Sequence, residues 1–142
     1  MAGWWQRLRA KLKGEAVSPE QARARFVENR AELERHFFEA ASASGKPRGL
    51  RWQALEWEPG LELAREKETG RLSGLVGVNI SFEAVEGGDM EDVSAVGLLR
   101  NASAVFFFFF HQGVWRTTGK VIMNLNPDEA IRHFGEQYER VG

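Results

Sequence analysis

The residues of this chain that could carry chemistry are few and scattered. Its three histidines, His36, His111 and His133, show neither the His-x-x-x-His nor the Glu-x-x-His spacing that brings metal ligands together on a helix. The chain contains no cysteine, which excludes disulfides, thiol catalysis and cysteine-based metal centres. We therefore expect neither a metal nor a cofactor.

His111 is the strongest single candidate for catalysis, because histidine titrates near neutral pH and this one ends a predicted strand beside a turn. Glu83 ends another predicted strand and could lie near it. Either residue could act as a general base in a small-ligand enzyme of isomerase or lyase type. The competing interpretation is that His111 is an ordinary residue before a turn.

The charges divide the chain into two parts. The first 14 residues carry no acid and four bases, whereas the rest carries 15 bases against 20 acids. An acidic main part argues against nucleic-acid binding. We predict a basic amphipathic segment at 1–14 attached to a single domain at 18–142. The four bases are Arg7, Arg9, Lys11 and Lys13.

The N-terminal segment also has an apolar stripe, since Trp4, Trp5, Leu8 and Leu12 fall at helical spacing. One interpretation is weak contact of residues 4–13 with an anionic membrane surface. The other is that both tryptophans pack on the domain or on a partner. A secretory signal would need a longer apolar region, so we expect a cytoplasmic protein.

Capping patterns and apolar spacing predict the helices. Ser18-Pro19 starts a helix expected over 19–44, and Asn126-Pro127 starts a last helix with Tyr138 on its apolar face. The segment 89–101 is ambiguous between a short helix, which we favour, and a loop followed by a strand.

Alternating apolar residues predict the strands. Pro59-Gly60 indicates a hairpin between the first two strands, and a change of phase after Ala54 indicates a bulge. The alternation from 75 to 85 is the most regular, and five consecutive phenylalanines mark a further strand. The expected strands are 50–58, 61–68, 75–85, 103–111 and 114–125.

A two-residue loop at Gln112-Gly113 would set the register of the last hairpin. It would pair His111 with Val114 and Phe110 with Trp115, so that Trp115 shares the core face with alternate phenylalanines. The opposite face of the hairpin then holds Val105, Phe107, Phe109, His111 and Arg116.

This second face is too apolar to be left in solvent. It could be covered by the chain's own C-terminal or N-terminal helix, by a second copy, or by a ligand or partner peptide. The residues we expect at a binding surface are Phe107, Phe109, His111, Arg116, Trp4 and Trp5.

These elements predict an α+β fold with a single antiparallel sheet of about five strands, a long N-terminal helix across one face and a C-terminal helix. Their order resembles that of small dimeric secretion-chaperone folds, and a helix laid on a curved sheet resembles cystatin-like and NTF2-like folds. We expect a non-enzymatic binding or adaptor module, acting as a homodimer or with a protein partner. The alternative is the small-ligand enzyme described above.

Overall fold

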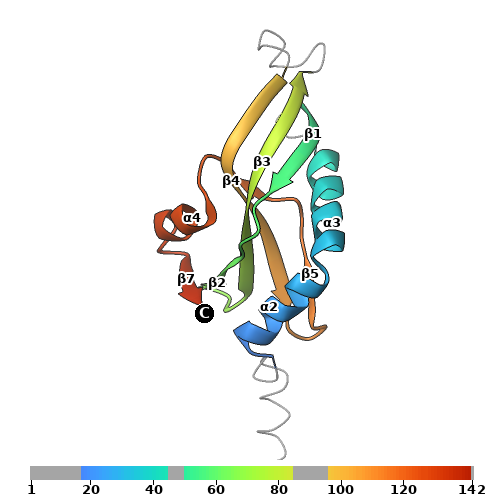
Figure 1. Cartoon of the computed structure of the whole chain (residues 1–142). Coiled ribbons are helices and arrows are strands. Elements are labelled where there is room, and N and C mark those ends of the chain that lie inside the picture. Colours follow the sequence, from blue (N-terminus) through green and yellow to red (C-terminus); the bar gives the residue numbers. More distant parts are fainter. Residues whose placement is uncertain (1–16, 45–49, 85–95, 142) are drawn as a thin grey trace, which may run out of the picture.

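A computed structural model describes residues 17–44, 50–84 and 96–141. It confirms the α+β class with a single antiparallel sheet, which has seven strands instead of about five. Figure 1 shows the helices on either side of this sheet. The helices are α2 (Pro19–Glu28), α3 (Arg30–Ala43) and α4 (Pro127–His133), and the strands are β1 (Leu50–Trp57), β2 (Glu62–Glu66), β3 (Leu72–Ala84), β4 (Val96–Phe109), β5 (Val114–Arg116), β6 (Val121–Ile122) and β7 (Tyr138–Val141).

The long strands β3 and β4 form the centre of the sheet, and the strand order is β5-β4-β3-β2-β7. The predicted hairpin between the first two strands is wrong, because β1 and β2 both pair with β3, as in Leu55↔Ile80 and Ala64↔Ser73. A 13-residue strand offers an edge long enough for two shorter strands in succession. The predicted bulge is confirmed as a register shift between Trp52 and Ala54.

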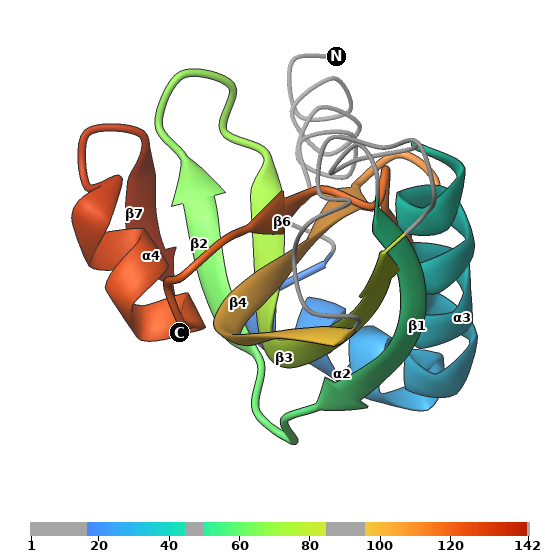
Figure 2. The same ribbon diagram turned by 90° about the horizontal axis from the view of Figure 1, so that it is seen from above.

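The predicted helix over 19–44 is two helices, interrupted at Asn29. The Asn29 side chain donates through Nδ2 to the carbonyl oxygen of Arg25 at 2.9 Å, and such local bonds compete with regular helix geometry. The apolar stripe nevertheless continues across the break, so both helices lie on the same face of the sheet (Figure 2). The buried residues of the stripe are Ala22, Phe26, Leu33, Phe37 and Ala41.

The helix favoured for 89–101 is wrong over residues 96–101, which belong to β4; residues 89–95 lie outside the described part. These strand residues pair with β3, as in Leu99↔Ile80. The register of β3 and β4 shifts between Val78 and Ile80. Asn101 lies at this shift with a φ of 57°, and its backbone N–H donates to Asn79 Oδ1 at 3.3 Å. An asparagine tolerates this left-handed conformation better than most residues.

The last hairpin has a longer loop than predicted. Phe109 pairs with Val114, so the loop spans 110–113 and the register differs by two residues from the expected one. A shift of two leaves every side chain on its predicted face, because successive side chains alternate. Gly113 has the predicted positive φ, at 67°.

The strand expected over 114–125 is interrupted, since β5 and β6 pair with β4 in different registers. The last helix is also shorter than expected. It ends at His133, and Tyr138 begins β7, which pairs with β2. Phe134 is the C-cap of this helix and Gly135 comes next, and glycine is a poor helix former.

The core has two parts, one on each face of the sheet. The larger lies between the sheet and α2–α3 and contains Phe106, Phe108 and Trp115, as the alternation predicts. The smaller lies between the sheet and α4. None of the helices described has the length and apolar character needed to cross a bilayer.

Candidate functional site

The second face of the sheet is covered over part of its length by the chain's own C-terminal elements. Val105 and Phe107 are buried in one cluster with Ile131 of α4 and Tyr138 of β7. The guanidinium carbon of Arg71 also lies 4.0 Å from the centre of the Phe107 ring. Of the covers considered for this face, the C-terminal helix therefore accounts for Val105 and Phe107.

Phe109 and Val114 remain outside this cover. They are cross-strand partners on β4 and β5, with 37% and 38% of their surface exposed. Val27, on α2, is the only other exposed large apolar residue in the described part of the chain. The apolar surface expected on this face is thus reduced to one pair at the end of the sheet.

The two catalytic candidates lie at opposite ends of the sheet. Glu83 pairs with Val96 at one end of β4, whereas His111 follows the other end, where Phe108 pairs with Leu72. The eleven residue-to-residue steps from Leu72 to Glu83 correspond to about 36 Å of strand. His111 and Glu83 therefore cannot act in one site.

The predicted site residues at the two ends of the sheet make few side-chain contacts. Glu83 accepts a hydrogen bond from Gln53 Nε2 at 3.1 Å, and His111 is exposed. Arg116 is exposed and donates to Gln112 Oε1 at 3.0 Å. Trp4 and Trp5, which we expected at a binding surface, lie outside the described residues.

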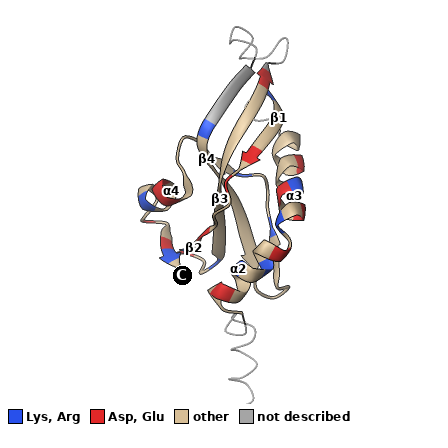
Figure 3. Ribbon diagram, viewed as in Figure 1, with Lys and Arg blue, Asp and Glu red and all other residues tan. Residues whose placement is uncertain are grey.

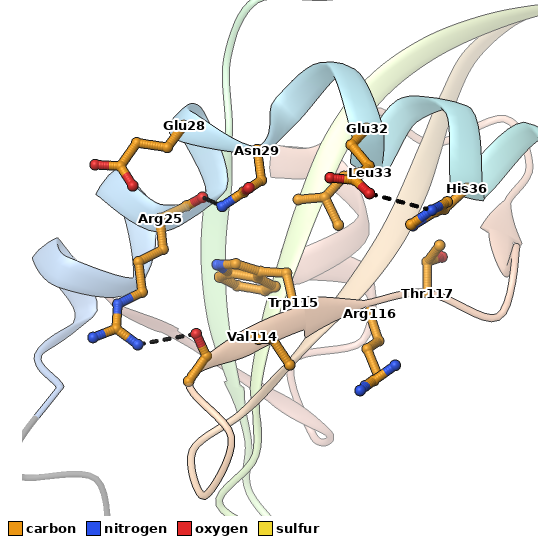
Figure 4. Close-up of a pocket in the computed structure, with 11 residues that line it drawn as sticks. Arg25, Glu28, Asn29, Glu32, Leu33, His36, Val114, Trp115, Arg116 and Thr117 are labelled. Atoms are coloured by element: carbon orange, nitrogen blue, oxygen red, sulfur yellow. Dashed lines mark hydrogen bonds and ion pairs between the residues drawn. The ribbon is translucent and has the colours of Figure 1, made fainter.

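A groove of about 610 Å³ lies between α2–α3 and β5 (Figure 4). The Trp115 ring occupies the space between helix and strand, and its Nε1 donates to the Ala22 carbonyl oxygen at 2.7 Å. Residues of both charges line it, Arg25, Glu28, Glu32 and Arg116, together with His36.

Sequence reasoning missed this groove, because it assigned Trp115 only to the core. The available signal was Glu28, Glu32 and His36 at intervals of four residues, which places three polar groups on one helical face. The strand that faces these polar groups is placed by the β4–β5 hairpin, and the spacing of residues within the helix does not indicate it.

A smaller hollow of about 340 Å³ lies where the start of α4 meets β3 and β4. Two of its carboxylates, Glu62 and Asp128, form ion pairs with Arg140. Its glycine, Gly77, leaves room for the Glu58 side chain, since a Cβ there would lie 2.9 Å from Glu58 Cγ. Contacts within the chain therefore already occupy the polar groups named in this hollow.

Charged residues lie mainly on the helices and near the strand ends (Figure 3). Among the described residues no group of His, Asp and Glu has the arrangement to hold a metal ion. In the same described segments one titratable group is clearly perturbed: burial, with a further contribution from Glu66, raises the pKa of Tyr138, and Arg71 lowers it in part. Tyr138 belongs to the core beneath α4 and not to the groove.

Comparison with known proteins adds no family to this description. No protein-family model, no curated protein sequence and no solved structure matches the chain.

Proposed function

We propose that this protein is a non-enzymatic binding or adaptor module that acts as a homodimer. The observation that carries the proposal is the pair Phe109 and Val114, which are exposed side by side at the edge of the sheet. Exposed apolar neighbours on a sheet edge favour association, because the pairing groups of the edge strand are available as well.

The structure of the rest of the chain supports a binding function over catalysis. His111 and Glu83 are separated by the length of the sheet, so no single pocket holds both candidates for a general base. Several charged groups on the surface pair with one another, as Arg71 does with Glu66 and Arg140 with Glu62.

The proposed dimer contact must extend beyond two side chains. Stable interfaces bury about 800 Å² on each partner, several times what Phe109 and Val114 can supply. In a two-fold dimer the same patch faces itself, so the neighbouring Arg116 and His111 would lie at its rim. Self-association of moderate strength is therefore the expected behaviour.

Sedimentation velocity of the full chain at micromolar concentration tests this proposal. We expect the wild-type protein to sediment as a dimer and Phe109→Lys to sediment as a folded monomer, because a buried lysine would face its own copy across the two-fold axis. Val27→Lys is the matched control, since Val27 is 63% exposed and lies on α2.

A wild-type monomer at these concentrations would contradict the homodimer. Equal dissociation of the Val27→Lys and Phe109→Lys variants would show that the effect is one of net charge and would remove Phe109 from the contact. Circular dichroism establishes that each variant is folded.

A further inference from the structure

Arg71 lies at the boundary between the covered and the exposed part of the second sheet face. Leu72 pairs with Phe108, so one step further in the same register Arg71 lies opposite Phe109. Successive side chains alternate along a strand, and both residues therefore belong to the face that holds Phe107. Arg71 is thus the neighbour of the exposed Phe109 on the side of β3.

The guanidinium of Arg71 is held on two sides by its own chain. Its central carbon lies 4.0 Å from the centre of the Phe107 ring, which covers one face of the group. Its Nε and Nη2 donate to the two carboxylate oxygens of Glu66, at 2.5 and 3.3 Å, and these bonds fix its plane. The side chain nevertheless remains 38% exposed, so the face opposite the Phe107 ring is open to a further contact.

Two arginines adjoin the exposed pair of apolar residues, and Arg71 is the one suited to burial. Its charge is neutralised by Glu66, and burying an ion pair that is already formed costs less than burying a lone cation. Arg116 donates to the amide oxygen of Gln112, and no carboxylate in the described part pairs with it, which favours a place at the rim. A guanidinium fixed in advance also loses little freedom when a second group packs on it.

An aromatic ring is the group that fits the open face of this guanidinium, because arginine stacks on aromatic faces and is attracted to their electrons. The exposed aromatic side chain of the same surface is Phe109. Neighbouring strands lie about 5 Å apart, so a two-fold axis that passes between Arg71 and Phe109 brings the ring of one copy over the guanidinium of the other. The same axis makes the reciprocal contact, and the dimer gains two contacts from one arrangement.

We propose that Arg71 determines the specificity of the dimer contact: its open face receives the partner's Phe109, so that the guanidinium lies between that ring and Phe107 of its own chain. This inference rests on the homodimer proposed above and names the residue that makes the exposed pair select a second copy. An apolar surface alone accepts many apolar partners, whereas a fixed guanidinium requires an aromatic ring at the matching position.

Sedimentation equilibrium of the full chain measures the contribution of Arg71 to the dimer dissociation constant. A cation–π contact corresponds to about threefold to tenfold in affinity, so Arg71→Met, which removes both symmetric contacts, should raise the constant by about tenfold or more. Arg71→Lys should also raise it, although less, because an ammonium keeps the charge beside Glu66 and has no flat face.

Arg140→Met is the matched control. Arg140 is 40% exposed and its Nη1 lies 2.5 Å from Glu62 Oε2, much as Arg71 pairs with Glu66, but it belongs to β7, away from Phe109. The dimer dissociation constant of Arg140→Met should equal that of the wild-type protein. Circular dichroism establishes that each variant is folded.

Mixing two variants shows whether the contact joins different copies. A dimer of one Arg71→Met chain and one Phe109→Leu chain keeps one of the two contacts between copies, whereas each variant's own dimer keeps neither. Native mass spectrometry of an equimolar mixture should therefore show about threefold to tenfold more mixed dimer than random pairing gives. A contact between Arg71 and Phe109 of the same chain would give random pairing, since both chains of the mixed dimer lack it.

The outcomes separate this inference from the proposal on which it rests. A wild-type monomer would contradict the homodimer and, with it, the role of Arg71. A wild-type dimer that Arg71→Met weakens no more than Arg140→Met does would overturn the role of Arg71 and leave the homodimer standing. Random pairing in the mixture would overturn the contact between copies.

Discussion

Gly119 gives the sharpest test of how the β5–β6 connection packs against α3. Its φ is +82°, and a Cβ built there would lie 2.5 Å from the Ala41 nitrogen and 2.8 Å from the Ala40 carbonyl carbon. Both are backbone atoms of a helix, so neither can move aside as the end of a flexible side chain would. We expect Gly119→Ala to destabilise the protein strongly.

Two contributions set the size of the effect. A Cβ in the left-handed region costs about 1–2 kcal/mol, and displacing the segment from the helix costs a further 1–3 kcal/mol or so. The free energy of unfolding should therefore fall by about 2–5 kcal/mol. For a chain of this length 1 kcal/mol corresponds to about 3 °C in Tm, so the melting temperature should fall by about 6–15 °C.

Two other glycines separate these contributions. Gly70 also has a positive φ, +76°, but nothing lies within 4 Å of its added Cβ, so Gly70→Ala measures the backbone strain alone. Gly60 has neither the positive φ nor a close neighbour, and Gly60→Ala should be neutral or stabilising by about 0.4–1 kcal/mol. Urea and thermal unfolding followed by tryptophan fluorescence give all three values. A Gly119→Ala variant no less stable than Gly70→Ala would refute the close approach to α3.

Two other properties can be checked on the same protein. Tyr138 is the only tyrosine, and burial raises its pKa, so at high pH the native state keeps a proton that the unfolded chain loses. The contribution of Tyr138 to the free energy of unfolding should therefore be constant below about pH 9 and fall as the pH rises through 10. Arg71→Met should raise this pKa further. Tyrosinate absorbance measures the pKa of Tyr138 in the wild-type protein and in the Arg71→Met variant. A titration at the usual pKa of tyrosine would contradict the burial. If residues 4–13 contact membranes, their four bases should contribute about 1 kcal/mol each, so binding of the full chain to anionic vesicles should be weak and reversed by salt. Vesicles that bind none of the protein at low ionic strength would end that interpretation.

Local patterns in the sequence predicted the parts of this fold that depend on neighbouring residues. The capping pattern at Ser18 is present with both reciprocal hydrogen bonds, and the one at Asn126 likewise. The alternation around Phe106 and Phe108 assigned the buried face correctly even where the register was wrong by two residues. A cap or a strand face is decided within a few residues, so its signal is local.

The candidate sites depended on contacts between distant segments, which local patterns do not contain. The sequence indicated that Phe107 and Phe109 needed a cover, but only the tertiary structure shows that α4 and β7 bury the first and leave the second exposed. The separation of His111 from Glu83 likewise follows from the pairing of two whole strands.

The groove is the clearest case of this division. The spacing in the sequence places Glu28 and Glu32 on one helical face, and the alternation places Trp115 on the core face of its strand. Only the packing of α2 against the β4–β5 hairpin, through the Trp115 indole and the Arg25 side chain, brings these groups to one place. These groups lie about 80 residues apart along the chain, and burial of the common core brings them together. The hydrophobic effect is non-directional, so the local sequence does not specify which distant residues become neighbours.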